Sequence, residues 1–386
     1  MTVGFARDHS VDLAVKGGGH SADTSSSTDG GVLIDLSSMK QVNVNPLSKT
    51  VTAQGGALWA DVNEAAGQSG LAVVGGTFSH VGVGGLCLRG GYGYLTPQYG
   101  LALDNLISVT IVVADGRVLR AARDENPDLF WAVRGAGPSV GVVAELVLQA
   151  HAQLHDVWHG IRTYAIEKLP QVIQELNGAM FHPRGRAAAE CVFSLSPDTR
   201  ELVINTVLFF NGSEEEGRRH FAGLLQLECL SNDVKMRPYA EANTLLDPVV
   251  PPGGRKKLVG LQLNPPIRPE FASEVMQEVS RQFTTKQDMA QSSVDLEFID
   301  LSRIRLPPTM ETAFPARSQA MNGVIILQWE DPNNDNEFLA WADKIQAMCK
   351  DESRRTGHQP NSLVSNFLNF TQGMCLSTRK ECITER

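Results

Sequence analysis

The stretch that decides the fold is Val15-Lys16-Gly17-Gly18-Gly19-His20-Ser21. A short apolar strand, predicted over residues 11–15, runs into three consecutive glycines and then a histidine. Consecutive glycines let the backbone approach a ligand closely and direct several N–H groups at one anion, typically a phosphate. The histidine would then lie against the rest of the molecule that carries the phosphate. Taken alone, the same pattern is equally typical of a simple tight turn.

Composition bounds what the chain can be. Its 386 residues are 42% hydrophobic and 20% charged, as expected of a soluble globular protein long enough for two domains. The net charge of −9, without a long basic run, argues against nucleic acid as a partner. No apolar stretch reaches the ~20 residues of a membrane span, and the N-terminus lacks the apolar core of a signal peptide, so we expect a cytoplasmic protein without a membrane partner. The six cysteines form no CxxC pair, so neither a metal site nor a disulfide framework is indicated.

The first part of the chain is rich in glycine and predicts short strands joined by tight turns. Because its strands and helices do not alternate regularly, an α+β fold is favoured over a doubly wound sheet. We assign residues 1–152 to this first domain. The predicted strands cover 32–36, 50–54, 107–113 and 140–148, and the predicted helices cover 59–66 and 128–133.

A second domain is predicted over residues 153–350, where glycine becomes sparse and the elements lengthen, followed by a C-terminal segment, 351–386. An antiparallel sheet with helices on one face fits the pattern. Pockets form preferentially at the junction of two such domains. The predicted strands cover 190–196, 201–210 and 323–329, and the amphipathic helices cover 214–226, 270–283 and 337–349.

The glycine clusters do not form a dinucleotide site of the Rossmann type or a P-loop. The cluster from Gly135 to Gly141 has the wrong spacing and follows a helical segment instead of a strand. The cluster from Gly82 to Cys87 ends in cysteine where a third glycine is required, and no P-loop lysine pattern occurs.

A series of motifs in fixed order resembles the FAD-binding, PCMH-type domain of the vanillyl-alcohol oxidase and berberine-bridge-enzyme superfamily. The resemblance covers residues 5–150 and is looser over 155–372. It implies a two-domain α+β fold in which an antiparallel-sheet substrate cap roofs the flavin. The motifs are Gly17–Ser21, Asp29–Leu36, Val81–Gly85, Gly90–Leu95, Tyr99–Leu106, Ala114–Val118, Asn126–Gly135 and Gly141–Val143.

The resemblance also implies the cofactor and the residues that hold it. His20 stands where many members bond an imidazole nitrogen to the 8α carbon of FAD, although it could instead only pack beside the pyrophosphate. The pyrophosphate would be held by one group of residues, and close approach of the backbone to FAD would need a second group. The first group is Gly17, Gly18, Gly19, Ser21, Gly76, Thr77, Ser79 and Gly82, and the second is Gly84, Gly85 and Gly91. Gly141 and Val143 match the family's backbone contacts on the adenosine and flavin sides.

Two positions refine the expected chemistry. Members with a second, cysteinyl flavin link carry cysteine where this chain has Phe78, so a single covalent link through His20 is predicted. Val81 stands at the position of the oxygen gatekeeper, where a small residue leaves room for O2 and favours an oxidase. Ordinary core packing explains a valine there equally well.

The catalytic base is the main departure from the family. Where members carry Tyr-x-Asn-Tyr, this chain has Phe367-Leu368-Asn369-Phe370, and phenylalanine cannot accept a proton. Tyr92 is therefore assigned, with Val81, to the catalytic residues. Each of the replacement candidates could equally be a packing or surface residue. These candidates are Tyr92, Tyr239, Glu297 and Glu330.

The function that the resemblance implies is a flavoprotein oxidase of secondary metabolism. It would move a hydride from a small, natural-product-like substrate to flavin N5 and then pass the electrons to O2, giving H2O2. Two alternatives stay open, a redox-neutral flavin-scaffolded cyclase or isomerase and a non-catalytic remnant. Compared with the family, both ends are short, which predicts a truncated chain of marginal stability. The sequence specifies no oligomeric state.

Overall fold

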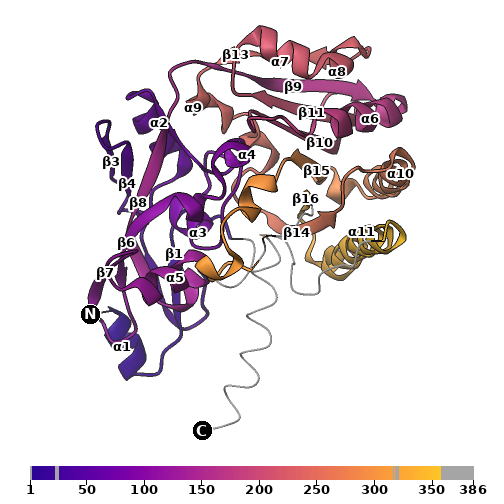
Figure 1. The fold of residues 1–386 in the computed structure, drawn as a ribbon. Coiled ribbons are helices and arrows are strands. Elements are labelled where there is room, and N and C mark those ends of the chain that lie inside the picture. Colours follow the sequence, from indigo (N-terminus) through magenta and orange to yellow (C-terminus); the bar gives the residue numbers. More distant parts are fainter. Residues whose placement is uncertain (1, 22–25, 316, 318–320, 358–386) are drawn as a thin grey trace.

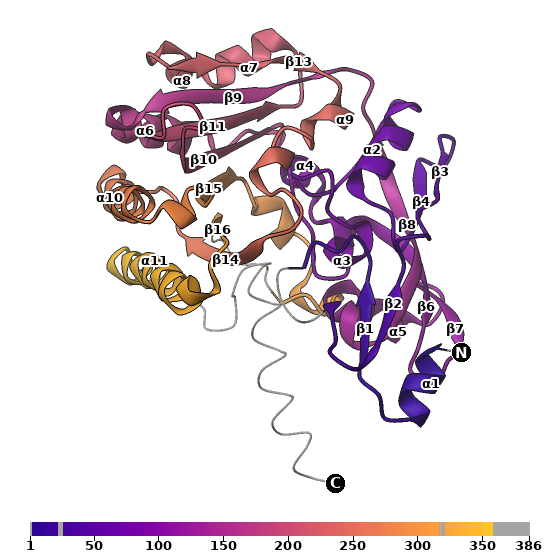
Figure 2. The ribbon, with the colours of Figure 1, turned by 180° about the vertical axis from the view of Figure 1, so that it is seen from behind.

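The computed structural model describes residues 2–21, 26–315, 317 and 321–357. Two large β-sheets, each with its own helices, lie side by side, and a small two-stranded sheet lies beside the first of them (Figures 1 and 2). The α+β class and the separation into an N-terminal and a cap sheet are as the sequence predicts.

The N-terminal sheet contains six strands in the order β3-β4-β8-β6-β7, with β5 pairing to β8. Its central strand β8 is the longest of the six, and its antiparallel neighbours β4 and β6 bury alternate residues against it. The small sheet pairs β1 and β2 in parallel, with Leu13 opposite Val32. The strands are β1 (Leu13–Lys16), β2 (Val32–Asp35), β3 (Val42–Asn45), β4 (Thr50–Gln54), β5 (Leu71–Val73), β6 (Leu106–Val112), β7 (Val118–Ala122) and β8 (Val142–Ala152).

The helices of this domain are short and begin at defined caps. Helix α2 begins after Leu58, whose N–H donates to the Asp61 carboxylate at 2.9 Å, and it buries Trp59 and Val62 completely. A carboxylate in the first turn of a helix accepts one of the amide hydrogens that lack an intrahelical partner. The helices are α1 (Thr2–Asp8), α2 (Trp59–Gly67), α3 (Val83–Cys87), α4 (Thr96–Tyr99) and α5 (Pro127–Ala136).

The cap sheet contains eight antiparallel strands in the order β12-β9-β11-β10-β15-β16-β14, with β13 pairing to β9. Glu190 on β10 lies opposite Glu297 on β15, a register that matters for the site described below. The strands are β9 (Val157–Ala165), β10 (Ala187–Leu195), β11 (Leu202–Phe210), β12 (Ser231–Asn232), β13 (Lys235–Arg237), β14 (Arg255–Leu263), β15 (Ser293–Ile299) and β16 (Met321–Trp329).

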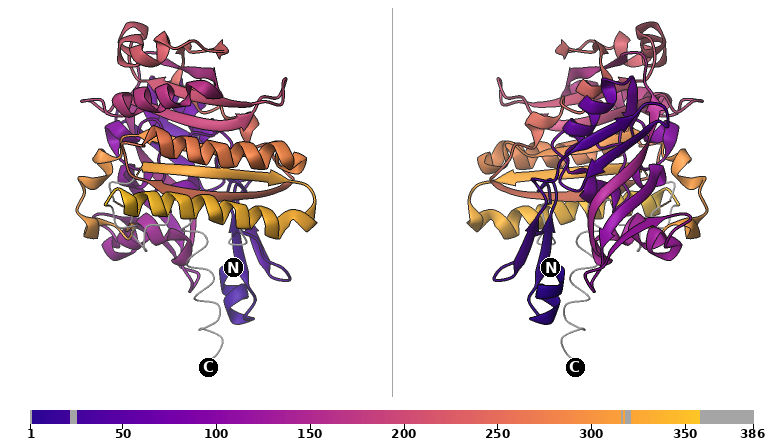
Figure 3. Two further views of the ribbon diagram at one scale, coloured as in Figure 1. Left: turned by 90° about the vertical axis from the view of Figure 1, so that its right-hand side faces the viewer. Right: turned by 90° about the vertical axis from the view of Figure 1, so that its left-hand side faces the viewer.

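The two faces of the cap sheet contribute side chains to two different hydrophobic cores. Because side chains alternate along a strand, Leu296 and Phe298 join a core with the long helices, which cover one face of the sheet (Figure 3). Ile299 and Phe209 instead join the core of the N-terminal domain on the opposite face. The cap helices are α6 (Leu169–Ala179), α7 (Glu214–His220), α8 (Ala222–Gln226), α9 (Tyr239–Ala242), α10 (Pro269–Thr285) and α11 (Asp335–Arg355).

The segment between β15 and β16 contacts the N-terminal domain through a buried ion pair, here termed the clamp. The Arg317 guanidinium, whose side chain is only 1% exposed, donates to both carboxylate oxygens of Asp104 at 2.7 and 3.1 Å. Close approach at the same clamp requires glycine at position 135, because a Cβ there would lie 2.4 Å from the backbone nitrogen of Phe314. Gly135 also has a φ of +128°, which few other residues adopt.

Most predicted elements are present, but several bounds differ. The predicted pair of strands at 190–196 and 201–210 is the β10–β11 hairpin, and strand 323–329 lies within β16. The single helix predicted over 214–226 is wrong, because Phe221 has non-helical φ/ψ of −100° and 25° and divides it into α7 and α8. The strand predicted over 140–148 starts at Val142 and continues to Ala152, and the helix predicted to end at Cys349 continues to Arg355.

No helix within the described ranges is both long enough and apolar enough to cross a membrane.

Candidate active site

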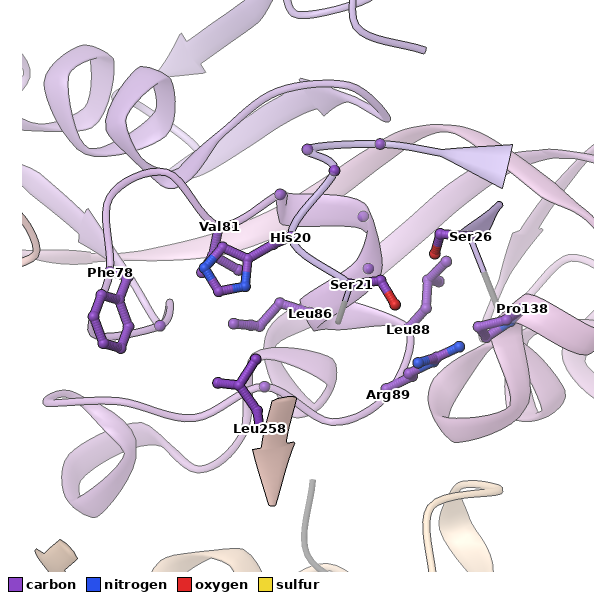
Figure 4. Close-up of a pocket in the computed structure, with 18 of the residues that line it drawn as sticks. His20, Ser21, Ser26, Phe78, Val81, Leu86, Leu88, Arg89, Pro138 and Leu258 are labelled. Carbon is purple, nitrogen blue, oxygen red and sulfur yellow. The ribbon is translucent and has the colours of Figure 1, made fainter. Parts of the chain in front are cut away.

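A cavity of about 390 Å³ lies between loops of the N-terminal domain and the cap sheet (Figure 4). Its volume lies in the range of ligand and cofactor pockets. The N-terminal domain contributes the loop after β1, the segments 76–92 and 138–143, and the cap contributes residues of β14, β15 and β16. The cavity thus has one wall of loops and one wall of sheet.

The loop wall depends on glycine for its shape. A Cβ on Gly18 would lie 2.6 Å from both the Cα and the nitrogen of Gly82, so the loop after β1 and the loop before α3 contact each other backbone to backbone. A Cβ on Gly85 would meet no protein atom within 4 Å. The two loops therefore bring exposed peptide groups to one side of the cavity, where an anionic group such as a pyrophosphate can be bound.

His20 projects from this wall into the cavity (Figure 4). Its Nε2 is buried and has no hydrogen-bond partner among the described residues. Its ring stacks on His80, with 5.0 Å between the ring centroids and 20° between the planes. Burial, assisted by His80, lowers the pKa of His20 to about 4, so the imidazole is neutral near pH 7 and keeps a nucleophilic lone pair.

The next loop is tied to the cap by an aspartate. The backbone N–H and the hydroxyl of Ser79 donate to the two carboxylate oxygens of Asp247 at 2.9 and 2.5 Å. The Nε2 of His80 lies 3.7 Å from the same carboxylate. These contacts hold the loop that carries Phe78 and His80 beside the His20 ring.

A carboxyl group reaches the cavity from the sheet wall. Glu297 of β15 accepts a hydrogen bond from the Tyr92 hydroxyl, and both residues line the cavity. Burial raises the pKa of Glu297 to about 7, and the Tyr92 hydrogen bond opposes that rise. A carboxyl that titrates near neutral pH in a pocket has the property required of a general base.

The structure brings nearly all predicted site residues to this cavity. Ser79 is the exception among the cofactor residues, because it does not line the cavity and binds Asp247. The residues that line it are Gly17, Gly18, Gly19, His20, Ser21, Gly76, Thr77, Gly82, Gly84, Gly85, Gly91, Gly141 and Val143, together with Val81 and Tyr92.

The four candidates for the catalytic base differ in whether they line the cavity. Glu297 and Tyr92 meet at the cavity, whereas Tyr239 is buried against Phe209 away from it. Glu330 lines a different cavity, of about 310 Å³. Phe367 and Phe370 lie outside the described residues.

The sequence did not indicate the apolar part of the sheet wall. Leu258 of β14 and Val324 and Ile326 of β16 line the cavity together with Phe78 and Val81. Figure 4 shows Leu258 across the cavity from the loops that carry Phe78 and Val81. Because Leu258 and Ile326 are register partners, only the strand pairing brings them together. No local pattern in the sequence marks them.

These features fit FAD. The glycine wall can hold a pyrophosphate, the buried Nε2 of His20 lacks a partner that a covalent bond to the flavin would supply, and Glu297 offers a proton acceptor. The described part of the chain contains no group of three histidine, cysteine or acidic residues that could hold a metal ion. Its cysteines, Cys87, Cys191, Cys229 and Cys349, are all unpaired thiols.

The fold and the cavity therefore define a two-domain FAD-dependent oxidoreductase. A family model for the FAD binding domain matches residues 1–122. The FAD-linked oxidoreductase pgmH of Aspergillus terreus is 30% identical over 384 residues, which cover 96% of this chain and 77% of that protein. The chain belongs to the FAD-linked oxidoreductases, as the sequence motifs predict.

Three further similarities are to nicotine and berberine enzymes. The (R)-6-hydroxynicotine oxidase of Paenarthrobacter nicotinovorans is 40% identical over 247 residues, which cover 63% of this chain and 54% of that protein. The crystal structure of 6-hydroxy-D-nicotine oxidase from Arthrobacter nicotinovorans has a TM-score of 0.78 at 24% identity and covers 95% of this chain and 80% of its own. Berberine bridge enzyme from Eschscholzia californica has a TM-score of 0.78 at 19% identity, with coverages of 95% and 75%. At these identities the two structures establish the fold.

Proposed function

We propose that this protein is an oxidase that holds FAD through a single covalent bond to His20. The observation that carries the proposal is the His20 Nε2, which is buried at the cavity, neutral near pH 7 and without a hydrogen-bond partner among the described residues. A buried nitrogen that lacks a partner is unfavourable unless a ligand engages it. A bond from this nitrogen to the 8α carbon of the flavin would remove that deficit.

Bound FAD would supply the redox chemistry, accepting a hydride from a substrate carbon and passing two electrons to O2 with formation of H2O2. The protein supplies placement. The loop around Gly18 and the loop around Gly82 would hold the pyrophosphate with peptide N–H groups. Gly85, where no protein atom would oppose a Cβ, leaves space for the cofactor itself.

Glu297 would act as the general base. As the hydride leaves the substrate carbon, the proton of the adjacent O–H or N–H moves to a carboxylate oxygen of Glu297. The Tyr92 hydroxyl, which donates to Glu297, orients that carboxylate and stabilises its charged form. Tyr92 itself cannot accept the proton near pH 7, because burial and the neighbouring carboxyls raise its pKa well above the ordinary value of 10.0 and keep its hydroxyl protonated.

The cap wall supports a small, mostly apolar substrate. Leu258, Val324 and Ile326 form an aliphatic surface opposite Phe78, and Glu297 is the acidic group that lines the cavity. Such a surface favours an organic alcohol or amine with a single polar group at the reacting carbon.

Covalent attachment is tested first by a visible spectrum of the purified protein and of its acid-precipitated, washed pellet. We expect a yellow pellet from the wild type and a colourless pellet from His20→Ala. A colourless wild-type pellet below a yellow supernatant would remove the covalent bond from the proposal and keep FAD. A protein that is colourless after incubation with excess FAD would overturn the proposal.

Oxidase activity is tested without knowing the substrate. The bound flavin is photoreduced under argon and then mixed with oxygenated buffer, while flavin absorbance and H2O2 are followed. We expect reoxidation within seconds in the wild type and about tenfold slower reoxidation in Val81→Leu, because the larger side chain fills the space beside the flavin. Reoxidation that takes many minutes in the wild type would indicate a dehydrogenase or the redox-neutral alternative.

A further inference from the structure

Behind the cavity wall lies a group of three buried carboxyls, Glu190 on β10 with Asp295 and Glu297 on β15, here termed the carboxyl cluster. Their exposed fractions are 1%, 6% and 8%. Glu190 and Glu297 are register partners, so their side chains project from the same face of the sheet, and Asp295 projects from that face two residues away. Of the three, only Glu297 lines the cavity.

No cation compensates the cluster within the described part of the chain, where none of its members forms an ion pair. Tyr92 and Tyr94 interact electrostatically with its carboxyls, and Arg89 and Lys257 line the same cavity as Glu297. Tyr92 donates to Glu297, and the Tyr94 ring lies 4.9 Å from the ring of His159. Tyr94 interacts electrostatically with Glu190 and with Tyr239. Burial lowers the pKa of His159 to about 4, so this histidine is uncharged near pH 7.

The three carboxyls cannot all be ionised in such surroundings. Burial and the neighbouring carboxyls raise the pKa of Asp295 well above its ordinary value. Burial and the charge of Glu297 raise the pKa of Glu190 to about 8, whereas the pKa of Glu297 is raised only to about 7, with the Tyr92 hydrogen bond opposing the rise. The Tyr92 hydroxyl donates to Glu297, whereas neither carboxylate oxygen of Glu190 has a hydrogen-bond partner among the described residues. Near neutral pH the cluster therefore retains protons on Asp295 and Glu190 and carries its negative charge on Glu297.

We propose that Glu190 is a positioning residue that holds a proton beside Glu297 and so confines a single negative charge to the cavity side of the carboxyl cluster. The proposal rests on the role of Glu297 as the base. Without the proton on Glu190, two adjacent carboxylates would share a buried space, and Glu297 would be held in its protonated form to a higher pH. With that proton in place, the carboxylate that can accept the substrate proton is the one in contact with the cavity.

The test is an infrared pH titration of the flavin-loaded protein, following the carbonyl stretch of protonated carboxyl groups. Exposed aspartates and glutamates are ionised above pH about 6, so the signal lost between pH about 6 and about 9 reports buried carboxyls. In the wild type we expect loss in two steps. Glu190→Gln should abolish the later step, and Glu297→Gln should abolish the earlier one and move the Glu190 step to lower pH.

The control is Glu201→Gln, which makes the same chemical change at an exposed carboxyl one residue before β11 and should leave the titration unchanged. Circular dichroism and unfolding curves verify that each variant is folded. A wild-type protein without protonated carboxyl signal above pH about 6, or two steps that persist in Glu190→Gln, would overturn the proposal. The titration needs no substrate and can be repeated on protein without flavin, so its failure is distinct from a failure of the proposed function.

Discussion

The two walls of the cavity are built by opposite means. The loop wall uses backbone, because three consecutive glycines precede His20 and three more, Gly82, Gly84 and Gly85, lie within four residues of one another. The cap wall uses side chains that lie far apart in the chain, from Leu258 to Ile326, and that meet only through strand register. The glycine loops would bind the pyrophosphate of FAD, which is the same in every catalytic cycle. The side chains of the cap wall would instead contact the substrate.

The same difference appears in the electrostatics. The loop wall places a neutral imidazole, His20, next to peptide groups that can stabilise an anion. The cap wall places an acid, Glu297, whose pKa is raised to about 7 because the side chain is buried. We therefore expect damage to the loop wall to abolish cofactor binding and damage to the cap wall to affect proton transfer while FAD stays bound.

The largest effect should come from Gly18→Ala. Its Cβ would lie 2.6 Å from the Gly82 backbone, which cannot move without separating the two loops, so bound flavin should be lost and the protein destabilised by about 1–3 kcal/mol. Flavin absorbance per protein and a denaturation curve measure the two effects. Gly85→Ala provides the comparison, because no protein atom opposes its Cβ, and it should weaken flavin binding with the unfolding curve unchanged. Full flavin retention in both variants would contradict the assignment of the loop wall.

Glu297→Gln should break the cap wall selectively. Removal of a general base lowers rates by about 10²–10⁴-fold, so reduction of the flavin by substrate should slow by that factor while the spectrum of bound FAD is retained. In the wild type the rate should rise with pH through about 7, because the base acts as a carboxylate above its pKa. Rapid-mixing reduction under argon measures both effects. A Glu297→Gln protein that is reduced at the wild-type rate would remove Glu297 from the mechanism.

Arg317→Ala should weaken the contact between the N-terminal domain and the segment that joins β15 to β16. The variant leaves the Asp104 carboxylate, whose side chain is 12% exposed, without its bidentate partner, and loss of one member of a buried ion pair is destabilising by about 3–5 kcal/mol. Chemical denaturation of the flavin-loaded protein measures this loss. Arg354→Ala is the matched control, because Arg354 is paired with Asp351 on the surface and should contribute less than about 1 kcal/mol. Equal stabilities of the two variants would show that the clamp contributes little.

The smallest effect concerns the pH dependence of stability. The folded-state pKa of Glu190 is raised from 4.5 to about 8, so the fold binds this proton more tightly than the unfolded chain does. The resulting stabilisation is fully present below pH about 4.5 and is lost as pH rises through about 8. Compared with the wild type, Glu190→Gln should gain relative stability between pH 5 and pH 9, measured by urea unfolding at both values. A parallel pH dependence in the two proteins would place the Glu190 ionisation outside this range.

The sequence predicted the loop wall almost completely. Each motif is a short run in which residue type and position are adjacent, and the backbone requirements of glycine are local. His20 could be identified for the same reason, since it directly follows the three glycines and reaches whatever the glycines hold. Ser79 shows the limit of this reasoning, because its hydroxyl turns to Asp247, a residue 168 positions later in the chain.

The cap wall could be predicted only in outline. The antiparallel strands at β10 and β11 were recognised, but β14 and β15 were not, and these strands carry Leu258 and Glu297. Glu297 was one of several equal candidates for the base, and nothing in the sequence distinguished it from Tyr239 or Glu330. Its proximity to Tyr92 separates it from them.

What the sequence determined by itself is the α+β class, the FAD-linked oxidoreductase family and the glycine loops of the loop wall, because each is encoded in short contiguous motifs. What only the tertiary structure decided is which side chains face those loops and how they ionise. Glu190 and Glu297 are more than a hundred residues apart, and they become one titrating unit because β10 and β15 pair in a single register that buries both on the same face. Burial and charge proximity are properties of that register.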